Sequence, residues 1–145
     1  MELAFQKARP EDIEVLFRFN RDLIDRYEAV QSIPYEGVLA WVRKKIEENI
    51  ESYTRIYADG CLAGFYRFLP NGDKMELDDL YIFPEFQNRG IGTRILKKCC
   101  RESDRPVMLY VFSRNTGAWK LYRRMGFEIR ETIKNTRYIM VKENL

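Results

Sequence analysis

The spacing of apolar residues along the chain changes between the period of a helix and that of a strand. From Pro10 to Glu28 apolar residues recur every three or four positions, as in a helix with one buried face. Residues 35–50 repeat this spacing and predict a second helix, whose apolar stripe comprises Val38, Trp41, Val42 and Ile46. From residue 53 the runs are rich in β-branched and aromatic residues, which predicts three antiparallel strands at about 53–58, 61–69 and 74–82.

Two dipeptides predict the tight turns between these strands. Asp59-Gly60 and Asn71-Gly72 each stand between β-rich runs. Two-residue hairpin turns need positive φ angles, which Asn, Asp and Gly adopt most readily. The sequence therefore predicts a meander of three strands joined by two hairpins.

The remaining segments complete a mixed pattern. The sequence predicts a short strand at 3–7, helices at 91–102 and 115–125, a buried strand at 107–112, and last strands at about 127–133 and 136–142. Gly126 is placed to end the second of these helices. The order indicates the α/β class, in its α+β form, with a mixed central sheet of about six to seven strands flanked by about four helices. We expect a single domain over residues 1–145.

Composition and charge exclude several classes of function. The chain carries 25 Lys and Arg against 22 Asp and Glu, a net charge of +3, so we expect no nucleic-acid partner. It has no histidine, which removes His-based triads and His-ligated sites, and we expect no metal. No segment approaches the roughly 20 apolar residues of a membrane span, so we expect no membrane partner. Three cysteines, an odd number, indicate reduced thiols in a cytoplasmic protein.

A basic turn that contains two glycines, QNRGIG (residues 87–92), joins the third strand of the meander to the next helix. Glycines let the main chain approach a ligand closely, and amides at the start of a helix suit a phosphate. A simple connecting turn has the same composition. The turn lacks the third glycine and the distant acid of a dinucleotide-binding fingerprint, and it lacks the Gly-Lys-Ser/Thr of a P-loop. The turn alone therefore leaves both interpretations open.

Two motifs at the expected separation give the chain a resemblance to a known family. The turn fits Q/R-x-x-G-x-G/A, the acetyl-CoA-binding motif of the GNAT superfamily of N-acetyltransferases, and LYIFPEF resembles its Leu-x-Val-x-Pro lead-in. The segment from Asn115 to Phe127 is similar to its N-x-x-A-x-x-L-Y-x-x-x-G-F element. The motifs cover about residues 75–128, and the order of helices and strands resembles the GNAT fold over the rest. The resemblance implies an acetyl-CoA-dependent N-acetyltransferase.

The resemblance also implies where coenzyme A binds. In the family the pantetheine arm hydrogen-bonds to the lead-in strand like an added strand, and main-chain amides of the turn hold the pyrophosphate. Carried over, main-chain groups of Leu80, Tyr81 and Ile82 hold pantetheine. The expected cofactor-binding residues of the turn and the later motif are Gln87, Asn88, Arg89, Gly90, Ile91, Gly92, Thr93 and Asn115.

The expected catalytic residues are Tyr122 and Glu76. Asn115 and Tyr122 are seven residues apart and lie on one helix face. In the family the tyrosine protonates the leaving thiolate, and a phenol is neutral at pH 7 and can donate a proton. Counting back six residues from Ile82 gives Glu76, which matches the general base of the histone-acetylating branch.

Alternatives to Glu76 stay open. Asp78 lies on the same strand face, and a water chain is the third candidate. The carboxylate that many members carry on the next strand is absent, because that stretch reads Leu-Tyr-Val at 109–111. We expect direct transfer in a ternary complex, with no covalent intermediate on Cys99 or Cys100.

The acceptor is expected to be a primary amine, on a small molecule or a protein. In the family acceptor contacts come from the first two helices and the loop between them. The acidic and aromatic segment 25–35 favours a small cationic amine. An acyl-CoA-binding sensor or interaction module with weak catalysis is the alternative function. The apolar C-terminal segment TRYIMV could pair across an edge in a homodimer.

Overall fold

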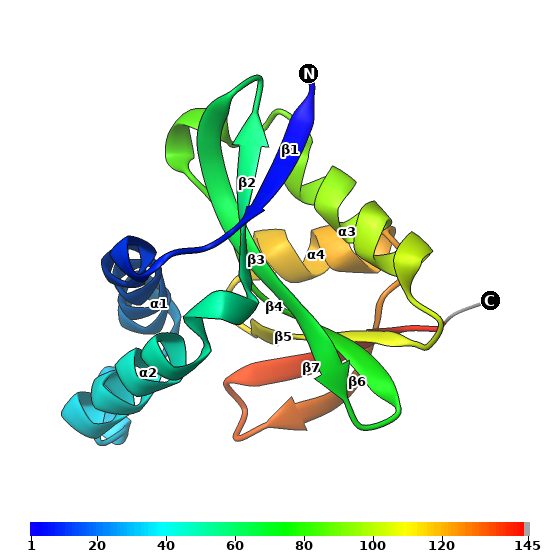
Figure 1. The fold of residues 1–145 in the computed structure, drawn as a ribbon. Helices are drawn as coiled ribbons and strands as arrows, with labels where there is room; N and C mark the ends of the chain where they lie inside the picture. The colour runs from blue at the N-terminus through cyan, green and yellow to red at the C-terminus, as the bar shows by residue number, and fades with distance from the viewer. Residues whose placement is uncertain (144–145) are drawn as a thin grey trace. The chain divides into compact units, whose positions relative to one another are not determined.

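The structure, a computed structural model, describes residues 1–143 and has the predicted order of helices and strands (Figure 1). The α-helices are α1 (Ile13–Tyr27), α2 (Tyr35–Asn49), α3 (Ile91–Glu102) and α4 (Thr116–Arg124). The strands are β1 (Leu3–Lys7), β2 (Tyr53–Ala58), β3 (Cys61–Asn71), β4 (Lys74–Ile82), β5 (Val107–Phe112), β6 (Glu128–Ile133) and β7 (Arg137–Lys142). In the described residues they form a mixed seven-stranded sheet in the order β1-β2-β3-β4-β5-β7-β6, which confirms the predicted fold class.

The chain divides into two compact units. The first comprises Met1–Arg67 and Asp79–Thr93, and the second comprises Phe68–Asp78 and the chain from Arg94 onward. The single domain over residues 1–145 stays a prediction. Among the described residues, no helix combines the length and the apolar character needed to cross a membrane.

The first unit contains an antiparallel sheet of β1, β2 and β3 and the helices α1 and α2, which pack against each other (Figure 1). Asp59 and Gly60 connect β2 to β3 with φ angles of 48° and 85°, which confirms the first predicted hairpin. The core of this unit includes Leu16, Ile46, Ile56 and Phe65, which are fully buried. Apolar side chains spaced for one helix face and one sheet face therefore meet as the pattern predicts.

A buried ion pair ties the start of α1 to β2. The carboxylate of Asp12 accepts hydrogen bonds from Nε and Nη2 of Arg55, at 2.7 and 2.8 Å, and both residues are buried. Asp12 also accepts from the main-chain N–H of Arg9 at 2.9 Å. The main-chain N–H of Asp12 donates to the carbonyl of Arg9 at 2.8 Å and closes a 3₁₀ turn at Pro10–Asp12, so the α-helix begins at Ile13 and not at Pro10 as predicted.

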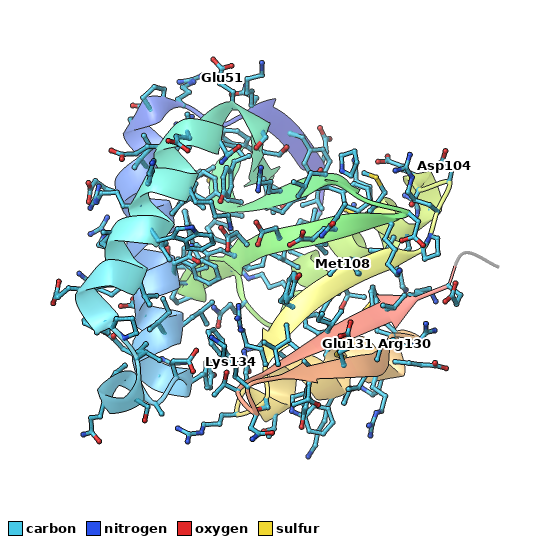
Figure 2. The ribbon with its side chains drawn as sticks, turned by 90° about the horizontal axis from the view of Figure 1, so that it is seen from below. Glu51, Asp104, Met108, Arg130, Glu131 and Lys134 are labelled. Carbon is cyan, nitrogen blue, oxygen red and sulfur yellow. The ribbon has the colours of Figure 1, made fainter. Side chains whose placement is uncertain are left out.

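In the second unit β5 runs parallel to β4 and antiparallel to β7, which also pairs with β6. The helix α4 covers one face of these strands, because the ring of its Trp119 lies 5.8 Å from that of Tyr138 on β7. Val111 pairs with Tyr138 and shares this face, so Met108, an odd number of residues away, lies on the opposite face. Figure 2 looks onto that opposite face, where Met108 is labelled.

The second predicted hairpin turn is wrong by one residue. β3 continues through Asn71, two residues beyond its predicted end, and the turn consists of Gly72 and Asp73. Gly72 has a φ of 63°, whereas Asn71 stays in the strand. The side chain of Asn71 donates hydrogen bonds to a carboxylate on β4 and a thioether on β5, contacts that an extended residue at this position can make.

Two predicted core positions are exposed. Trp41 on α2 is 65% exposed, because it lies about 100° around the helix from Val42, and the buried stripe is centred on Val42 and Ile46. Tyr110 in β5 is 42% exposed, since side chains alternate along a strand and Tyr110 lies on the face opposite α4. The strand at 107–112 is therefore buried on the face toward α4 and partly open on the other.

Candidate active site

The turn after β4, in the first unit, forms a concave row of main-chain amides. Asn88 has a φ of 63° and Gly90 a φ of 82°, with Arg89 between them in an ordinary conformation. Successive residues that alternate in this way direct their N–H groups to one side, the geometry of an anion-binding nest. Residues 87–90 are exposed, so the amides are accessible to a ligand. We call residues Gln87–Thr93 the cradle.

The side chain of Gln87 fastens the cradle to the end of β4. Its Nε2 donates a hydrogen bond of 2.9 Å to the main-chain carbonyl of Ile82. The structure therefore brings together two residues that were predicted to bind the cofactor, Gln87 and Ile82, through a contact with each other. Gln87 positions the turn, and the amides that follow it face solvent.

The helix α3 begins at Ile91, within the cradle, and its first turn forms the last part of the cradle. Ile91 is fully buried and anchors this turn, while the helix continues for 12 residues and carries a partial positive charge at its start. A Cβ atom added at Gly92 would have only the Cγ1 of Ile82, at 4.0 Å, as a described neighbour. Gly92 is thus not required by packing within the protein, and the space beside it remains open for a ligand.

The side chain of Arg89 is held beside the main chain of the cradle by an aromatic ring. Its guanidinium carbon lies 5.5 Å from the ring centre of Phe86, which belongs to the short 3₁₀ turn Pro84–Phe86. Such a cation–π contact orients the charge without neutralising it. Arg89 can therefore supply positive charge next to the amides.

The last residues of β4 are fixed from two sides. The ring of Tyr81 stacks on that of Phe19 from α1, with centres 4.2 Å apart, and burial raises the pKa of the Tyr81 phenol. On β3, Gly64 lies against the main chain of Tyr81, and a Cβ atom there would overlap the carbonyl oxygen. Asp79 adopts a φ of 50°, an irregularity that turns the main chain of β4 just before Leu80. The main chain at Leu80–Ile82 is thus held firmly in the conformation that a hydrogen-bonding ligand would meet.

The Asp79 carboxylate has a structural role in the first unit. It accepts hydrogen bonds from the hydroxyl of Tyr53 at 2.7 Å and from the Lys45 ammonium at 3.5 Å. Its side chain is 9% exposed. These contacts tie β4 to β2 and α2, and they set Asp79 apart from Glu76 and Asp78 as a candidate base.

In the second unit, Asn115 and Tyr122 stand at the start and in the last turn of α4. The Oδ1 of Asn115 accepts a hydrogen bond of 3.4 Å from the N–H of Ala118, so this side chain caps the helix. Burial raises the pKa of the Tyr122 phenol, whose ring lies 6.2 Å from that of Phe127. The phenol therefore stays protonated at neutral pH and can act as a proton donor.

Glu76 lies in the second unit on the strand face opposite α4. It pairs with Met108 across the parallel β4–β5 ladder, and paired residues share a face. Its Oε1 accepts a hydrogen bond of 3.1 Å from Nδ2 of Asn71. Asp78 lies two residues further along the same face, and Tyr110 stands on β5 at the position where the resemblance leads one to look for a carboxylate.

The three cysteines, all within the described part of the chain, are free thiols. Burial raises the pKa of Cys99 to about 12 and also raises that of Cys100, while Cys61 is exposed. A thiol with a raised pKa is a poor nucleophile at neutral pH. Cys99 and Cys100 are therefore unsuited to forming a covalent acyl intermediate.

A shallow cavity of about 350 Å³ lies in the first unit, where α1 ends and α2 begins. It is lined by Asp25, Val30, Gln31 and Tyr35. The Tyr35 hydroxyl donates a hydrogen bond of 2.5 Å to Asp25, and this bond raises the pKa of the phenol. The segment predicted to contact the acceptor thus contains an exposed carboxylate and an aromatic ring beside a hollow.

Two features of the site have no local signal in the sequence. The hydrogen bond from Asn71 to Glu76 was missed because an Asn-Gly pair is typical of a turn. The Phe19–Tyr81 stack joins residues far apart in the chain, and aromatic residues at helix and strand positions do not reveal their partners. Both contacts follow from tertiary structure and not from spacing.

Comparison with known proteins identifies the family. A model of the acetyltransferase (GNAT) family matches residues 16–127, which include Glu76, the cradle and Tyr122. The chain belongs to the GNAT acetyltransferase family. This membership confirms the family that the two motifs predicted. It also confirms the expected class of enzyme, an acetyl-CoA-dependent acyltransferase.

Individual relatives agree with this assignment. This GNAT acetyltransferase is 26% identical to the spermidine N(1)-acetyltransferase of Thermoplasma acidophilum, over 99% of this chain and 98% of that protein. It is 36% identical over 78 residues to an uncharacterized N-acetyltransferase of Methanocaldococcus jannaschii, and this match covers 51% of the chain and 34% of the relative. The crystal structure of the PaiA N-acetyltransferase from Thermoplasma acidophilum, in complex with coenzyme A, has a TM-score of 0.69 with 24% identity and covers 99% of both chains. This likeness confirms the GNAT fold.

Proposed function

We propose that this GNAT acetyltransferase moves the acetyl group of acetyl-CoA to a primary amine by direct attack in a ternary complex. The observation that carries the proposal is the cradle, an exposed amide nest with positive φ at Asn88 and Gly90, placed at the start of α3. A row of N–H groups at the positive end of a helix dipole suits a pyrophosphate. The function therefore begins with the binding of coenzyme A by its phosphates.

The proposed roles in cofactor binding differ in kind. Main-chain groups of Leu80, Tyr81 and Ile82 hydrogen-bond pantetheine, and main-chain amides from Asn88 to Thr93 hold the pyrophosphate. Arg89 adds charge, Gln87 keeps the turn in place, and Ile91 anchors it. Asn115 uses its Oδ1 to cap α4, which leaves the amide group of the same side chain as its donor toward coenzyme A.

Tyr122 is the proposed general acid. When the amine attacks, the thioester breaks and negative charge develops on the sulfur. A phenol whose pKa is raised by burial stays neutral at the working pH and donates a proton to that sulfur. The high pKa of Cys99 supports transfer without an acyl-cysteine.

Glu76 is the proposed general base. A lysine-like amine has a pKa of about 10.4 and is protonated at neutral pH, so it must lose a proton before it attacks. Glu76 lies on the strand face opposite the helix that carries Tyr122, so the proposed base and the proposed acid belong to different sides of the sheet of the second unit. Asp78 on the same face is the second candidate.

The proposed acceptor is a small cationic amine. The cavity beside Asp25 and Tyr35 offers a carboxylate and an aromatic ring, which together favour a cation. The name of the Thermoplasma relative, a spermidine N(1)-acetyltransferase, agrees with an acceptor of this class.

The proposal is tested by release of free thiol from acetyl-CoA with a panel of amines. We expect spermidine and other small cationic amines to accelerate release, and acidic amines to be inert. Tyr122→Phe should lower kcat by roughly a hundredfold with little change in the KM for acetyl-CoA. Tyr138→Phe is a matched control in the same unit, which keeps the ring that packs on Trp119 and should retain full activity. Tight binding of coenzyme A without amine-dependent release would favour the sensor.

A further inference from the structure

We infer that Asn71 is a positioning residue for the general base Glu76. The inference rests on the proposed function, in which Glu76 accepts the proton of the amine. The Nδ2 of Asn71 donates a hydrogen bond of 3.1 Å to Oε1 of Glu76 and lies 3.5 Å from the thioether sulfur of Met108. All three residues belong to the second unit and come from three successive strands of the sheet.

The hairpin between β3 and β4 creates this contact. Asn71 is the last residue of β3 and Glu76 the third of β4, and only Gly72 and Asp73 lie between the strands. A turn this short places Asn71 diagonally across from Glu76 on one face, a distance that side chains bridge. Met108 pairs with Glu76 from the other side and is buried, so the amide is held between a fixed sulfur and the carboxylate.

This arrangement suits a base more than a simple strand contact. A carboxylate at the middle of a half-buried strand can still rotate, whereas a donor on Oε1 restricts the rotation of the carboxylate plane. A neutral amide donor also stabilises the charged form of the carboxylate without adding a competing charge. Asn71 therefore orients the carboxylate of Glu76 and favours its charged form, and it does not itself contact the substrate.

Other charged or titratable groups share this face of the sheet. By strand alternation and register they are Lys74, Asp78, Tyr110, Glu128, Glu131 and Arg137. Each stays unchanged in the variants below, so a difference between variants reports on Asn71 and Glu76.

The test is the pH dependence of kcat/KM with acetyl-CoA and spermidine. Asn71→Ala removes the donor, and Asn71→Asp keeps the shape but sets a like charge beside Glu76. We expect Asn71→Ala to lower kcat/KM at pH 7 by about fivefold and to move the acidic limb of the profile up by roughly half a pH unit. Asn71→Asp should move that limb further, since it adds repulsion to the loss of the bond.

The same Asn71 variants made in a Glu76→Gln protein distinguish an effect on the position of Glu76 from an effect on the stability of the fold. In Glu76→Gln, which lacks an ionisable base, the Asn71 variants should have no further effect on kcat/KM, because Asn71 acts through Glu76. Asp73→Ala alters the same hairpin turn without touching the carboxylate and should leave the pH profile unchanged. Thermal unfolding confirms that each variant is folded, and Asn71→Asp provides the test if Asn71→Ala does not fold.

Three results would overturn the inference. An unchanged pH profile in both Asn71 variants would show that the hydrogen bond from Asn71 to Glu76 has only a structural role. An equal loss of kcat/KM with and without the Glu76→Gln substitution would mean that Asn71 acts by another route. Full activity of the Glu76→Gln variant would show that Glu76 is not the base, and both the proposed role of Glu76 and this inference would then be wrong. A loss of kcat/KM in Glu76→Gln, with no change in kcat/KM or its pH profile in the Asn71 variants, would contradict only the inference.

Discussion

Two glycines of the cradle meet different requirements, although the motif treats them alike. Gly90 has a φ of 82°, a conformation that other residues rarely adopt, while no described atom lies within 4 Å of the Cβ it lacks. Gly92 has no such angle and lies in the first turn of α3, with Ile82 4.0 Å from its missing Cβ. Backbone geometry therefore explains the glycine at 90, and the proposed ligand explains the glycine at 92.

Gly92→Ala should separate folding from binding. Alanine is favoured over glycine inside a helix, so the free energy of unfolding should stay equal or rise by up to about 1 kcal/mol. The added methyl group occupies space that the pyrophosphate is proposed to fill, and the affinity for coenzyme A should fall by roughly tenfold or more, the worth of one charged hydrogen bond. Chemical denaturation and calorimetric titration with coenzyme A measure the two quantities.

Gly90→Ala is the paired comparison, because there the strain itself costs about 1 kcal/mol of stability. Arg89→Ala should keep stability and weaken coenzyme A by only a few fold, since the main-chain amides carry most of the proposed contacts. Unchanged affinity in Gly92→Ala would show that the phosphates lie elsewhere.

At the scale of elements, the close approach of β3 to β4 depends on a single missing side chain. A Cβ at Gly64 would collide with the carbonyl oxygen of Tyr81 and lie 3.1 Å from the Cα of Ile82. Main-chain atoms cannot rotate away as a side chain can. Gly64 therefore sets how near the proposed pantetheine-binding segment of β4 lies to its neighbour in the first unit.

Gly64→Ala should lower the free energy of unfolding by about 3 kcal/mol, as expected for an overpacked site that forces the backbone to move. Gly37→Ala on α2 is the matched control, because no described atom lies within 4 Å of its added Cβ and helix propensity favours alanine. Urea denaturation of both variants checks this. Equal stability of Gly64→Ala and the unmodified protein would mean that the main chains of β3 and β4 can move apart at this position at little cost in free energy.

Several element boundaries agree closely with those predicted from the spacing and type of neighbouring residues. The sequence predicted the helix α3, in which Ile91, Ile95 and Leu96 are buried, and the hairpin turn at Asp59-Gly60. Both predictions were possible because helix period and positive φ depend on residues close together in the chain. The turn between β6 and β7 uses Lys134 and Asn135 at φ angles of 51° and 59°, without a glycine. That turn carries a weaker signal, so only its approximate place was predicted.

At the scale of the whole molecule, the sequence predicted the class and the family better than the details of the site. The family motifs name positions, but they say nothing of the partner of each side chain. Asn71 illustrates this limit, because its acceptors are five and 37 positions away and the local pattern favours a turn. The roles of Glu76, Tyr122 and the cradle depend on a ligand, so they stay predictions that binding and kinetics must test.

The proposed division of coenzyme A into a phosphate part and a pantetheine part predicts how ligands stabilise the protein. A ligand that binds only the folded state raises the free energy of unfolding by about 2.7 kcal/mol at a hundred times its Kd. At equal concentration we expect coenzyme A to raise Tm clearly, ADP to raise it less, and pantetheine, which has no pyrophosphate, to raise it least. Differential scanning fluorimetry measures all three shifts.

Gly92→Ala supplies the control for this series, because it alters the proposed phosphate contacts and leaves the main chain of Leu80–Ile82 in place. In that variant the Tm shifts with coenzyme A and ADP should both shrink toward the small shift with pantetheine, which should not change. If pantetheine stabilised the unmodified protein as strongly as coenzyme A does, the binding energy would come from β4, and the amides of the cradle would serve only to connect it to α3.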